Sequence, residues 1–365
     1  MMQKSSLSSL LKRIQVLPTW ITLPSLVLLL LAALLLGVSF GSTAIPFGAI
    51  LQVLLNGTGL FHFARQWDPA TEIIIWQLRL PLVVGVALVG AALAVAGTLF
   101  QAILRNPLAD PFLIGTSSGA ALGATIAFVI PFAAASAYSE FFPLTSLLAF
   151  LGAILTVFVV YLLAHSGGET PVVTLLLAGV VLNAVLVAAQ TVLLTFAPAG
   201  SQLRGIAAVF NWLSGGVSVT GWSPVILVGG IISFGILLAL LLSGVLDAFG
   251  LGEESAAYLG LHVERYKLLV IGLASLITAA AVSISGLIGF VGLVTPHILR
   301  LILGPRHRLL VPASALGGAI FLILANLLAR AILAPNVLPD GVFTALIGAP
   351  FFLFLLRKSR RTYRW

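Results

Sequence analysis

The chain has 365 residues, of which 60% are hydrophobic and 8% are charged, and its mean hydropathy is +1.19. Soluble domains are about a quarter charged, so this composition indicates an integral membrane protein and excludes a water-soluble domain. The net charge of +8 does not indicate nucleic-acid binding, because the Lys and Arg residues lie in short segments between apolar runs. The absence of cysteine excludes disulfide bonds and thiolate metal sites.

The apolar runs favour membrane-spanning helices over barrel strands. Barrel strands alternate apolar and polar residues over about ten positions, whereas runs such as "LVLLLLAALLLGVSF" (26–40) do not alternate. The first run is too long for a signal-peptide core and lacks a clear cleavage site, so we expect it to be retained. A length of about twenty residues per span predicts ten helices, at 20–40, 82–104, 114–132, 144–165, 172–196, 224–246, 268–284, 286–303, 309–332 and 341–357.

The distribution of Lys and Arg predicts the orientation. With ten spans both termini share one side, and fourteen of the 18 Lys and Arg residues lie on that side. Positive residues concentrate in the cytoplasm, so we expect both termini there. The alternative of one bent helix and a half-span at 268–303 would move the basic residues at 300–308 and at the C-terminus to the other side, and the asymmetry would be lost. The predicted parts are a cytoplasmic segment (1–19), a single transmembrane permease domain (20–357) with a cytoplasmic loop (247–267), and a basic cytoplasmic tail (358–365).

A polar segment, "RNPLADPFLIGTSSGAALGA" (105–124), lies between apolar runs. Pro107 and Pro111 disfavour helix at the residues before them, and the small residues that follow allow close helix packing. Non-helical backbone at membrane depth is tolerated only where protein buries it or water reaches it. We therefore interpret the segment as bordering an aqueous path. An ordinary cytoplasmic turn followed by a packing helix is the alternative, and the pattern alone leaves both open.

The titratable residues form none of the familiar catalytic or metal-binding patterns. All ten acidic residues fall in predicted loops or at span ends, whereas gradient-driven carriers keep ionisable groups near the membrane centre. The five histidines are dispersed, and the chain has neither a phosphate-binding Walker loop nor a zinc-binding H-E-x-x-H. His297 follows Pro296, where we expect a helix break. These features argue against an enzyme and a metal site, so any energy has to come from a partner.

The largest predicted cytoplasmic loop contains a short amphipathic helix, "EESAAYLGL" (253–261), bounded by Gly252 and Gly260. Glu253 and Glu254 suit a helix N-terminus electrostatically. The apolar residues after them form a small surface that fits a groove on a soluble partner. The alternative is a loop helix that rests on its own membrane domain.

Several long motifs in one order resemble the permease subunits of bacterial ABC importers for ferric siderophores, haem and cobalamin. The matching stretches are "QLRLPLVVGVALVGAALAVAGTLFQAILRNPLADPFLIGTSSGAALGA" (77–124), "LLLAGVVLN" (175–183), "GLGEESAAYLGL" (250–261), "GLIGFVGLVTPHILRLILGPRHRLLVPASALGGA" (286–319) and "LPDGVFTALIGAPFFLFLL" (338–356). The resemblance implies a multi-pass homodimer in the bacterial cytoplasmic (inner) membrane. It also implies two ATPase subunits that bind ATP and Mg, and an external substrate-binding protein, while this chain binds no cofactor.

The resemblance also assigns roles to residues on the cytoplasmic side. In the family, "GEESAAYLG" (252–260) is the coupling segment that docks into the ATPase, which selects Gly252, Glu253, Glu254, Ala256, Ala257, Leu259 and Gly260. The "NPL" turn matches a gate at the cytoplasmic mouth of the path, formed by Asn106, Pro107 and Leu108. A second gate segment places Val172 and Val173 at positions where the cobalamin permease of the family is more polar. We interpret the preceding Gly167 and Gly168 as a hinge.

On the outer face, arginines of the family receive carboxylates of the binding protein in a bidentate geometry. Arg79 and Arg330 match these positions. The family pattern often continues "RLPR", whereas this chain has Leu82 at the fourth position, which puts one docking contact in doubt. A ferric siderophore is favoured as the cargo because it is the commonest in the family. The alternatives from other classes are a gradient-driven carrier or channel without an ATPase, and a structural membrane scaffold.

Overall fold

The computed structural model describes residues 19–41, 45–57, 59, 63–65, 67–129, 143–197, 199–332 and 336–359. Most of the predicted N-terminal segment (1–19) and of the basic tail (358–365) lies outside these residues, as does the end of the third predicted span (130–132). Apart from one bridge between Ser166 and Glu169, the described residues form helices and loops. The all-α fold class is therefore confirmed.

The described chain contains fifteen α-helices and one π-helical turn. Its first half comprises α2 (Thr19–Ser39), α3 (Phe47–Gly57), α4 (Pro69–Ile73), a π-helical turn (Ile74–Arg79), α5 (Leu80–Ile103), α6 (Thr116–Val129), α8 (Leu144–Ala164) and α9 (Val172–Thr195). Its second half comprises α10 (Ala199–Leu213), α11 (Ser223–Leu241), α12 (Ser243–Gly250), α13 (Glu253–Tyr258), α14 (Val263–Ser285), α15 (Val291–Leu303), α16 (His307–Ala331) and α17 (Asp340–Ser359).

Each predicted span coincides with a helix, but these helices differ in length. In the described part of the chain, seven are long and apolar enough to cross a membrane: α2, the continuous helix from α4 through α5, α8, α9, α11, α14 and α16. The remaining three predicted spans correspond to the shorter apolar helices α6, α15 and α17. The count of ten spans therefore stays a prediction.

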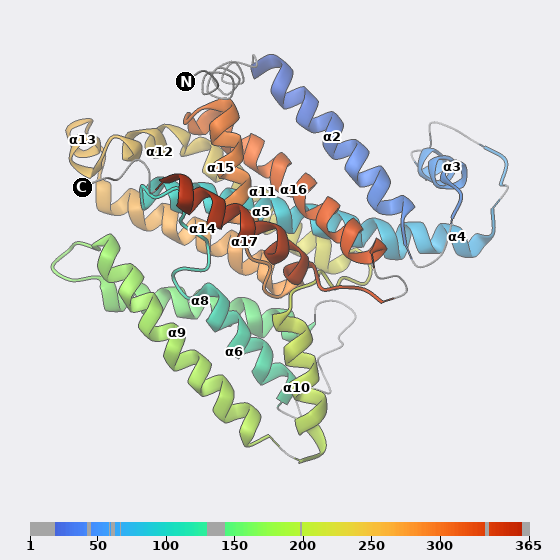
Figure 1. Cartoon of the computed structure of the whole chain (residues 1–365), viewed down its shortest axis with the longest axis horizontal. Coiled ribbons are helices and arrows are strands. Elements are labelled where there is room, and N and C mark those ends of the chain that lie inside the picture. The colour runs from blue at the N-terminus through green and yellow to red at the C-terminus, as the bar shows by residue number, and fades with distance from the viewer. Residues whose placement is uncertain are drawn as a thin grey trace, which may run out of the picture.

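The helices form two groups (Figure 1), one with α6, α8, α9 and α10 and the other around α5, α14, α15 and α16. In the second group α5 packs against α14, α15 and α16, and α14 also contacts α6 and α8 of the first group. Burial reaches 78% in the apolar stretches of α5 and α14 but only 11% in that of α9. The surface of α9 therefore has to face lipid or another protein.

Glycines set the closest helix contacts. A methyl group at Gly97 of α5 would overlap the backbone of Gly292 on α15. Methyl groups at Gly119 and Gly123 of α6 would likewise overlap the backbone of α8. The predicted close packing of the small residues after position 114 is therefore confirmed.

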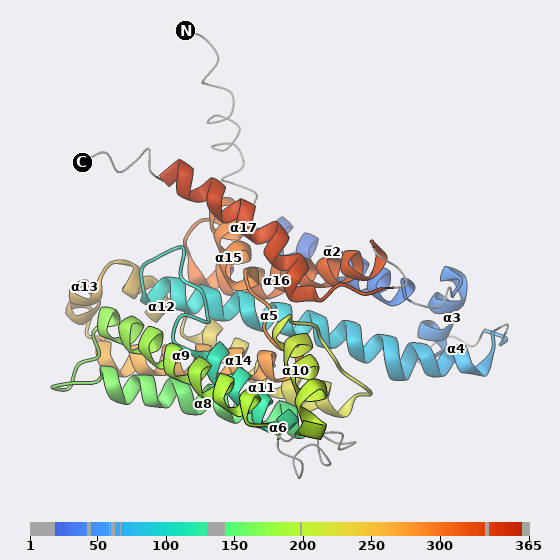
Figure 2. The ribbon, with the colours of Figure 1, turned by 60° about the horizontal axis from the view of Figure 1, so that its bottom comes forward.

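The two ends of the molecule differ. The helix α13 and the loop between α8 and α9 lie at one end, and α3 and α4 lie at the opposite end (Figures 1 and 2). In both views α2 begins, and α17 ends, toward the end that holds α13.

Pro296 does not break α15, so the helix break expected there is wrong. The helix runs from Val291 through Pro296 to Leu303 and is separate from α14. With 13 residues it is shorter than a full span, so the choice between a span and a half-span there stays a prediction. Proline has no N–H for the carbonyl four residues earlier, which is that of Gly292. Gln101 Nε2 on α5 donates to this oxygen at 3.3 Å. A neighbouring helix thus replaces the missing donor, as is common in membranes.

The second span begins earlier than predicted, because α4, the π-helical turn and α5 form one continuous helix. In this turn the N–H of Leu80 donates to the carbonyl of Ile75, five residues earlier. The same register would pair the carbonyl of Trp76 with Pro81, which has no N–H. Trp222 Nε1 donates to the Trp76 oxygen instead, at 2.8 Å. The helix therefore continues through Pro81, one residue before the predicted start of the span.

The helices α3 and α10 were not predicted. They have 11 and 15 residues, which is shorter than a membrane span of about twenty residues. Neither helix therefore forms an apolar run long enough to predict a span.

Candidate functional site

Two consecutive turns shape the first predicted gate segment. Asn106 Oδ1 accepts a hydrogen bond from the Leu108 N–H at 2.9 Å, and Asp110 Oδ1 accepts one from the Phe112 N–H, also at 2.9 Å. A proline follows each acceptor residue and fixes the turn. Asn106 and Pro107 are exposed and Leu108 is half-buried. The predicted non-helical backbone is confirmed.

Asp110 is half-buried at the second turn. Burial raises the pKa of its carboxyl to about 6, and the bond from the Phe112 N–H acts in the opposite direction. This carboxyl therefore holds its proton more tightly than an exposed aspartate does.

The segment that carries the first gate residues, 105–113, contacts two further elements. A methyl group at Gly252, just before α13, would lie 3.4 Å from Arg105 Nη1. A methyl group at Gly179 of α9 would lie 2.8 Å from the carbonyl oxygen of Leu113. Arg105 has a φ of 46°, which is uncommon for a residue other than glycine. The segment therefore bridges the start of α13 and the body of α9.

The helix predicted at 253–261 is present as α13, but it ends at Tyr258, three residues earlier. Gly252 and Gly260 flank it with φ values of 110° and 84°, in the region that favours glycine. Ala256 is fully buried and anchors the helix to the rest of the protein, whereas Tyr258 is 92% and Leu259 64% exposed.

The other predicted coupling residues differ in exposure. Glu254 and Ala257 are exposed, whereas Glu253 is half-buried. Large apolar side chains exposed outside the candidate spans are typical of a protein–protein contact.

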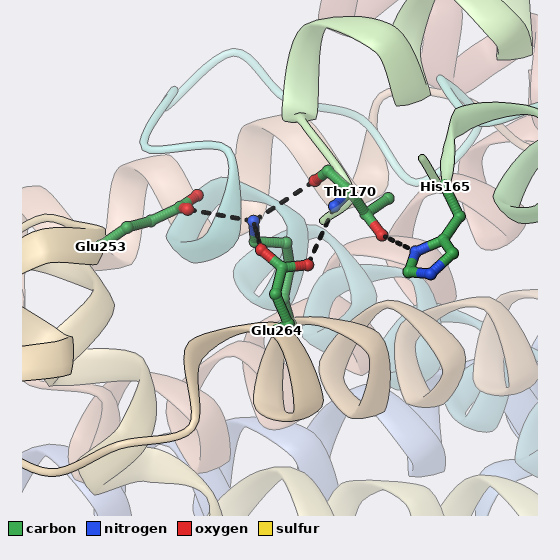
Figure 3. A network of polar contacts seen from close by, with 5 residues as sticks. His165, Thr170, Glu253 and Glu264 are labelled. Atoms are coloured by element: carbon green, nitrogen blue, oxygen red, sulfur yellow. Dashed lines mark hydrogen bonds and ion pairs between the residues drawn. The ribbon is translucent and has the colours of Figure 1, made fainter. Parts of the chain in front are cut away.

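Lys267 joins three segments (Figure 3). Its Nζ donates to Glu264 Oε1 at 2.7 Å, to Glu253 Oε2 at 3.0 Å and to the carbonyl oxygen of Thr170 at 3.3 Å. Glu264 Oε2 accepts from the Thr170 N–H at 3.0 Å. The Lys267 side chain is 3% exposed, and the two carboxylates are about one-third exposed. Glu253 belongs to α13, Glu264 and Lys267 to α14, and Thr170 to the loop before α9.

The loop before α9 is a tight turn. Ser166 and Glu169 exchange two backbone hydrogen bonds of 3.0 and 3.2 Å around Gly167 and Gly168, whose φ values are 62° and 85°. His165 Nδ1 lies 3.0 Å from Thr170 Oγ1. The two glycines therefore close a turn, and a hinge motion there stays a prediction.

The second predicted gate segment follows this turn directly at the start of α9. Val172 is half-buried and Val173 is 67% exposed. A polar residue, Asn183, lies exposed at the middle of the same helix.

The two predicted docking arginines meet at the C-terminal end of α2. Arg79 Nη1 donates to the carbonyls of Val38 and Ser39, at 2.9 and 3.2 Å. Arg330 donates to two neighbouring carbonyls at 3.3 Å each, those of Gly37 and Phe40. Cations stabilise helix C-termini. Arg79 is 6% exposed, whereas Arg330 is half-buried.

Sequence reasoning missed the roles of Lys267, Glu264 and Thr170. A signal was present, because Glu264 and Lys267 stand three positions apart at the head of an apolar helix, a spacing that brings side chains together. Thr170 carried no signal, since it lies 97 residues from Lys267. Among the described residues, no group of three or more His, Asp or Glu side chains is arranged to hold a metal ion.

The described chain is thus a multi-pass membrane protein with a short exposed helix, α13, at one end. The model of the FecCD transport family matches residues 29–358, and the chain belongs to this family. It is a multi-pass protein of the inner membrane, and its relatives are permease components of ABC import systems.

Two relatives and one solved structure illustrate the similarity. The cobalamin import permease BtuC of Halobacterium salinarum is 38% identical over 86% of this chain and 85% of its own length. The Fe(3+)-citrate import permease YfmD of Bacillus subtilis is 40% identical over 80% of this chain and 84% of its own. An inward-facing structure described as a metal-chelate type ABC transporter is 30% identical, covers 92% of this chain and 98% of its own, and has a TM-score of 0.77.

Proposed function

We propose that this chain is the translocation subunit of an ATP-driven importer, paired with a second copy of itself and with two cytoplasmic ATPase subunits. An external binding protein delivers a metal chelate, which passes between the two copies into the cytoplasm. The ATPase subunits bind ATP and Mg, and this chain binds no cofactor. The family membership supports this assignment.

The observation that carries the proposal is the surface of α13. Tyr258 and Leu259 are large, exposed and outside the candidate spans, so they offer an apolar contact to a soluble partner. We assign the ATPase contact to the coupling residues named above. Ala256 contributes from the buried side, by holding the helix in place.

A homodimer around a central path is supported by α9. An amide such as Asn183 is costly in lipid, yet it is exposed at the middle of a helix that is otherwise mostly apolar. A second copy, or water in a path between the copies, satisfies it. Two gates close the cytoplasmic mouth of this path. The first consists of Asn106, Pro107 and Leu108, and the second of Val172 and Val173.

Ten spans with cytoplasmic termini agree with the Lys and Arg distribution and with the common direction of the α2 start and the α17 end. The segment 1–19, the domain 20–357 and the tail 358–365 are then cytoplasmic, transmembrane and cytoplasmic. On the outer side, Arg330 receives a carboxylate of the binding protein. Arg79, the second predicted docking residue, is 6% exposed, so we assign it to supporting the α2 end on which this contact rests.

The cargo is a metal chelate, and a ferric siderophore is our first choice. Cobalamin and Fe(3+)-citrate appear in the names of the two relatives. Fe(3+)-citrate is itself a ferric chelate, which supports an iron cargo.

The test is co-isolation with a co-expressed candidate ATPase in lipid nanodiscs. We expect Leu259→Asp to abolish ATPase association, because a charge replaces an apolar contact. Phe63→Asp is the matched control, since Phe63 is also exposed, at 40%, but lies between α3 and α4 at the opposite end. Equal association of both variants would contradict the proposal.

A further inference from the structure

We propose that Lys267 is the positioning residue that connects the ATPase-docking helix α13 to the second gate segment at the start of α9. This inference rests on the proposed function, because it assumes that α13 receives the ATPase. It assigns to Lys267 the transmission of ATPase movement to the gate.

The first argument is that the number of hydrogen-bond donors on the ammonium group equals the number of its acceptors. A lysine ammonium has three N–H donors, and Lys267 has three acceptors in three separate segments, namely Glu253, Glu264 and Thr170. The side chain is 3% exposed, so water does not readily replace a lost acceptor. Moving any one of the three segments alone therefore leaves a buried donor unpaired, which is costly.

The second argument is that Glu264 and Lys267 both hydrogen-bond to the backbone of Thr170. Its N–H donates to Glu264 and its carbonyl accepts from Lys267, at 3.0 and 3.3 Å. Both polar groups of one peptide segment are thus held by one turn of α14. Thr170 is separated from Val172 by Pro171 alone, and proline restricts the backbone. A displacement of Thr170 is therefore passed on to the start of α9.

The third argument is that α13 is a short, separate unit, which Ala256 anchors to the rest of the protein. Gly252 and Gly260 flank six helical residues, and a methyl group at Gly260 would meet nothing within 4 Å. The first gate segment meets the same place, because Arg105 packs beside Gly252. Arg105, next to the first gate residues, therefore lies beside the start of α13. Glu253 at this start is linked through Lys267 to Thr170, two residues before Val172.

The test uses a reporter cysteine in the assembled complex. The chain contains no cysteine, so Val173→Cys, at a position that is 67% exposed, gives a single site for maleimide labelling. The ATPase and binding protein used are cysteine-free. The quantity measured is the ratio of labelling rates with and without ATP, on complexes isolated with the ATPase bound.

We expect ATP to change the labelling rate in the parent protein. Lys267→Met should reduce this change by about tenfold, because one charge-assisted hydrogen bond contributes about that factor to an equilibrium constant. Glu253→Gln acts in the same direction. The double variant should be no worse than Lys267→Met, because Glu253 then has no partner to lose. Glu169→Gln, an exposed carboxylate of the same loop that does not contact Lys267, is the matched control and should behave as the parent.

The outcomes separate the two proposals. If ATP does not change the labelling rate of the parent protein, the proposed function itself is contradicted. A parent that responds, with Lys267→Met and Glu253→Gln responding equally well, overturns the role of Lys267. Additive effects of the two substitutions also overturn it. If Lys267→Met does not assemble, Glu253→Gln decides alone, since Glu264 and Thr170 still pair the ammonium.

Discussion

Gln101 on α5 donates a hydrogen bond of 3.3 Å to the carbonyl of Gly292 on α15, the oxygen that Pro296 leaves without its helical donor. Arg300 Nη1 donates to Oε1 of the same glutamine at 2.8 Å, which fixes the orientation of the amide. A proline inside one helix is thus compensated by a polar side chain from another. This arrangement predicts a measurable energetic coupling between the two helices.

Gln101→Met should lower the free energy of unfolding by about 1–3 kcal/mol, because it leaves a buried carbonyl unsatisfied. In a Pro296→Ala background the new alanine N–H supplies the missing donor, so the cost of Gln101→Met should fall by about 1 kcal/mol. Unfolding in detergent, followed by circular dichroism, measures both differences.

Gln190→Met serves as the matched control for this cycle, since Gln190 is buried and donates to Thr125 rather than to α15. Its cost should be the same in the parent and in the Pro296→Ala background. Equal costs of Gln101→Met in the two backgrounds would contradict the coupling.

Asp110→Asn should change how stability depends on pH. The folded-state pKa of Asp110 is raised from 3.8 to about 6, so the folded protein binds this proton more tightly than the unfolded chain. Stability is therefore lost as the pH rises between about 4 and 6. Asparagine keeps the acceptor for the Phe112 N–H and removes the titration, so the variant should be more stable than the parent at pH 7. The gain has an upper limit of about 3 kcal/mol, and solvent screening of the half-buried group lowers it.

Asp68→Asn is the control, because Asp68 is exposed and accepts a comparable bond from the Ala70 N–H at 3.1 Å. Melting temperatures from pH 4 to 7 give the comparison. A pH profile for Asp110→Asn that parallels the parent would show that this carboxyl does not contribute.

Gly97→Ala should destabilise the protein by about 1–3 kcal/mol, since the added methyl group overlaps the backbone of Gly292. Gly230→Ala on α11 should be neutral or stabilising by up to about 1 kcal/mol, because no atom lies within 4 Å of its added methyl group. Heat denaturation in one detergent compares them. Similar losses in both variants would show that glycine contacts do not set the α5–α15 distance.

Arg330→Gln should weaken the apparent affinity for the loaded binding protein by about tenfold. The readout is the binding-protein concentration that half-maximally stimulates ATP hydrolysis. Arg65→Gln is the control, because Arg65 is an exposed arginine near α4 that is paired with Glu72 at 2.7 Å. Equal effects of the two substitutions would mean that Arg330 has no specific docking role.

Much of the fold was predictable, because apolar runs of about twenty residues have few alternatives to helices in lipid. Polar and proline-containing positions were harder. A helix break was expected at Pro296, but Pro296 and Pro81 are both tolerated, because Gln101 and Trp222 reach the affected backbone oxygens from elsewhere in the fold. Such compensation joins residues distant in sequence and has no local pattern.

The site shows the same division. The glycines around α13 and the two prolines in the first gate segment act locally, and the predicted helix and turns were found there. In the Lys267 cluster only the Glu264–Lys267 pair has a spacing that indicates contact. The contact with Thr170, 97 positions away, required the structure. Arg79 and Arg330 were selected by motif, but their shared contact with the end of α2 required the structure.

The most direct test of the central claim is uptake into proteoliposomes that contain this permease, with or without the candidate ATPase, and with a loaded binding protein outside. A ferric hydroxamate, haem and cobalamin are offered separately as cargo. We predict that at least one accumulates inside against its gradient, only when the ATPase is present and ATP is supplied to its side of the membrane. Equal uptake without the ATPase, driven by a substrate or ion gradient, would contradict an ATP-driven importer.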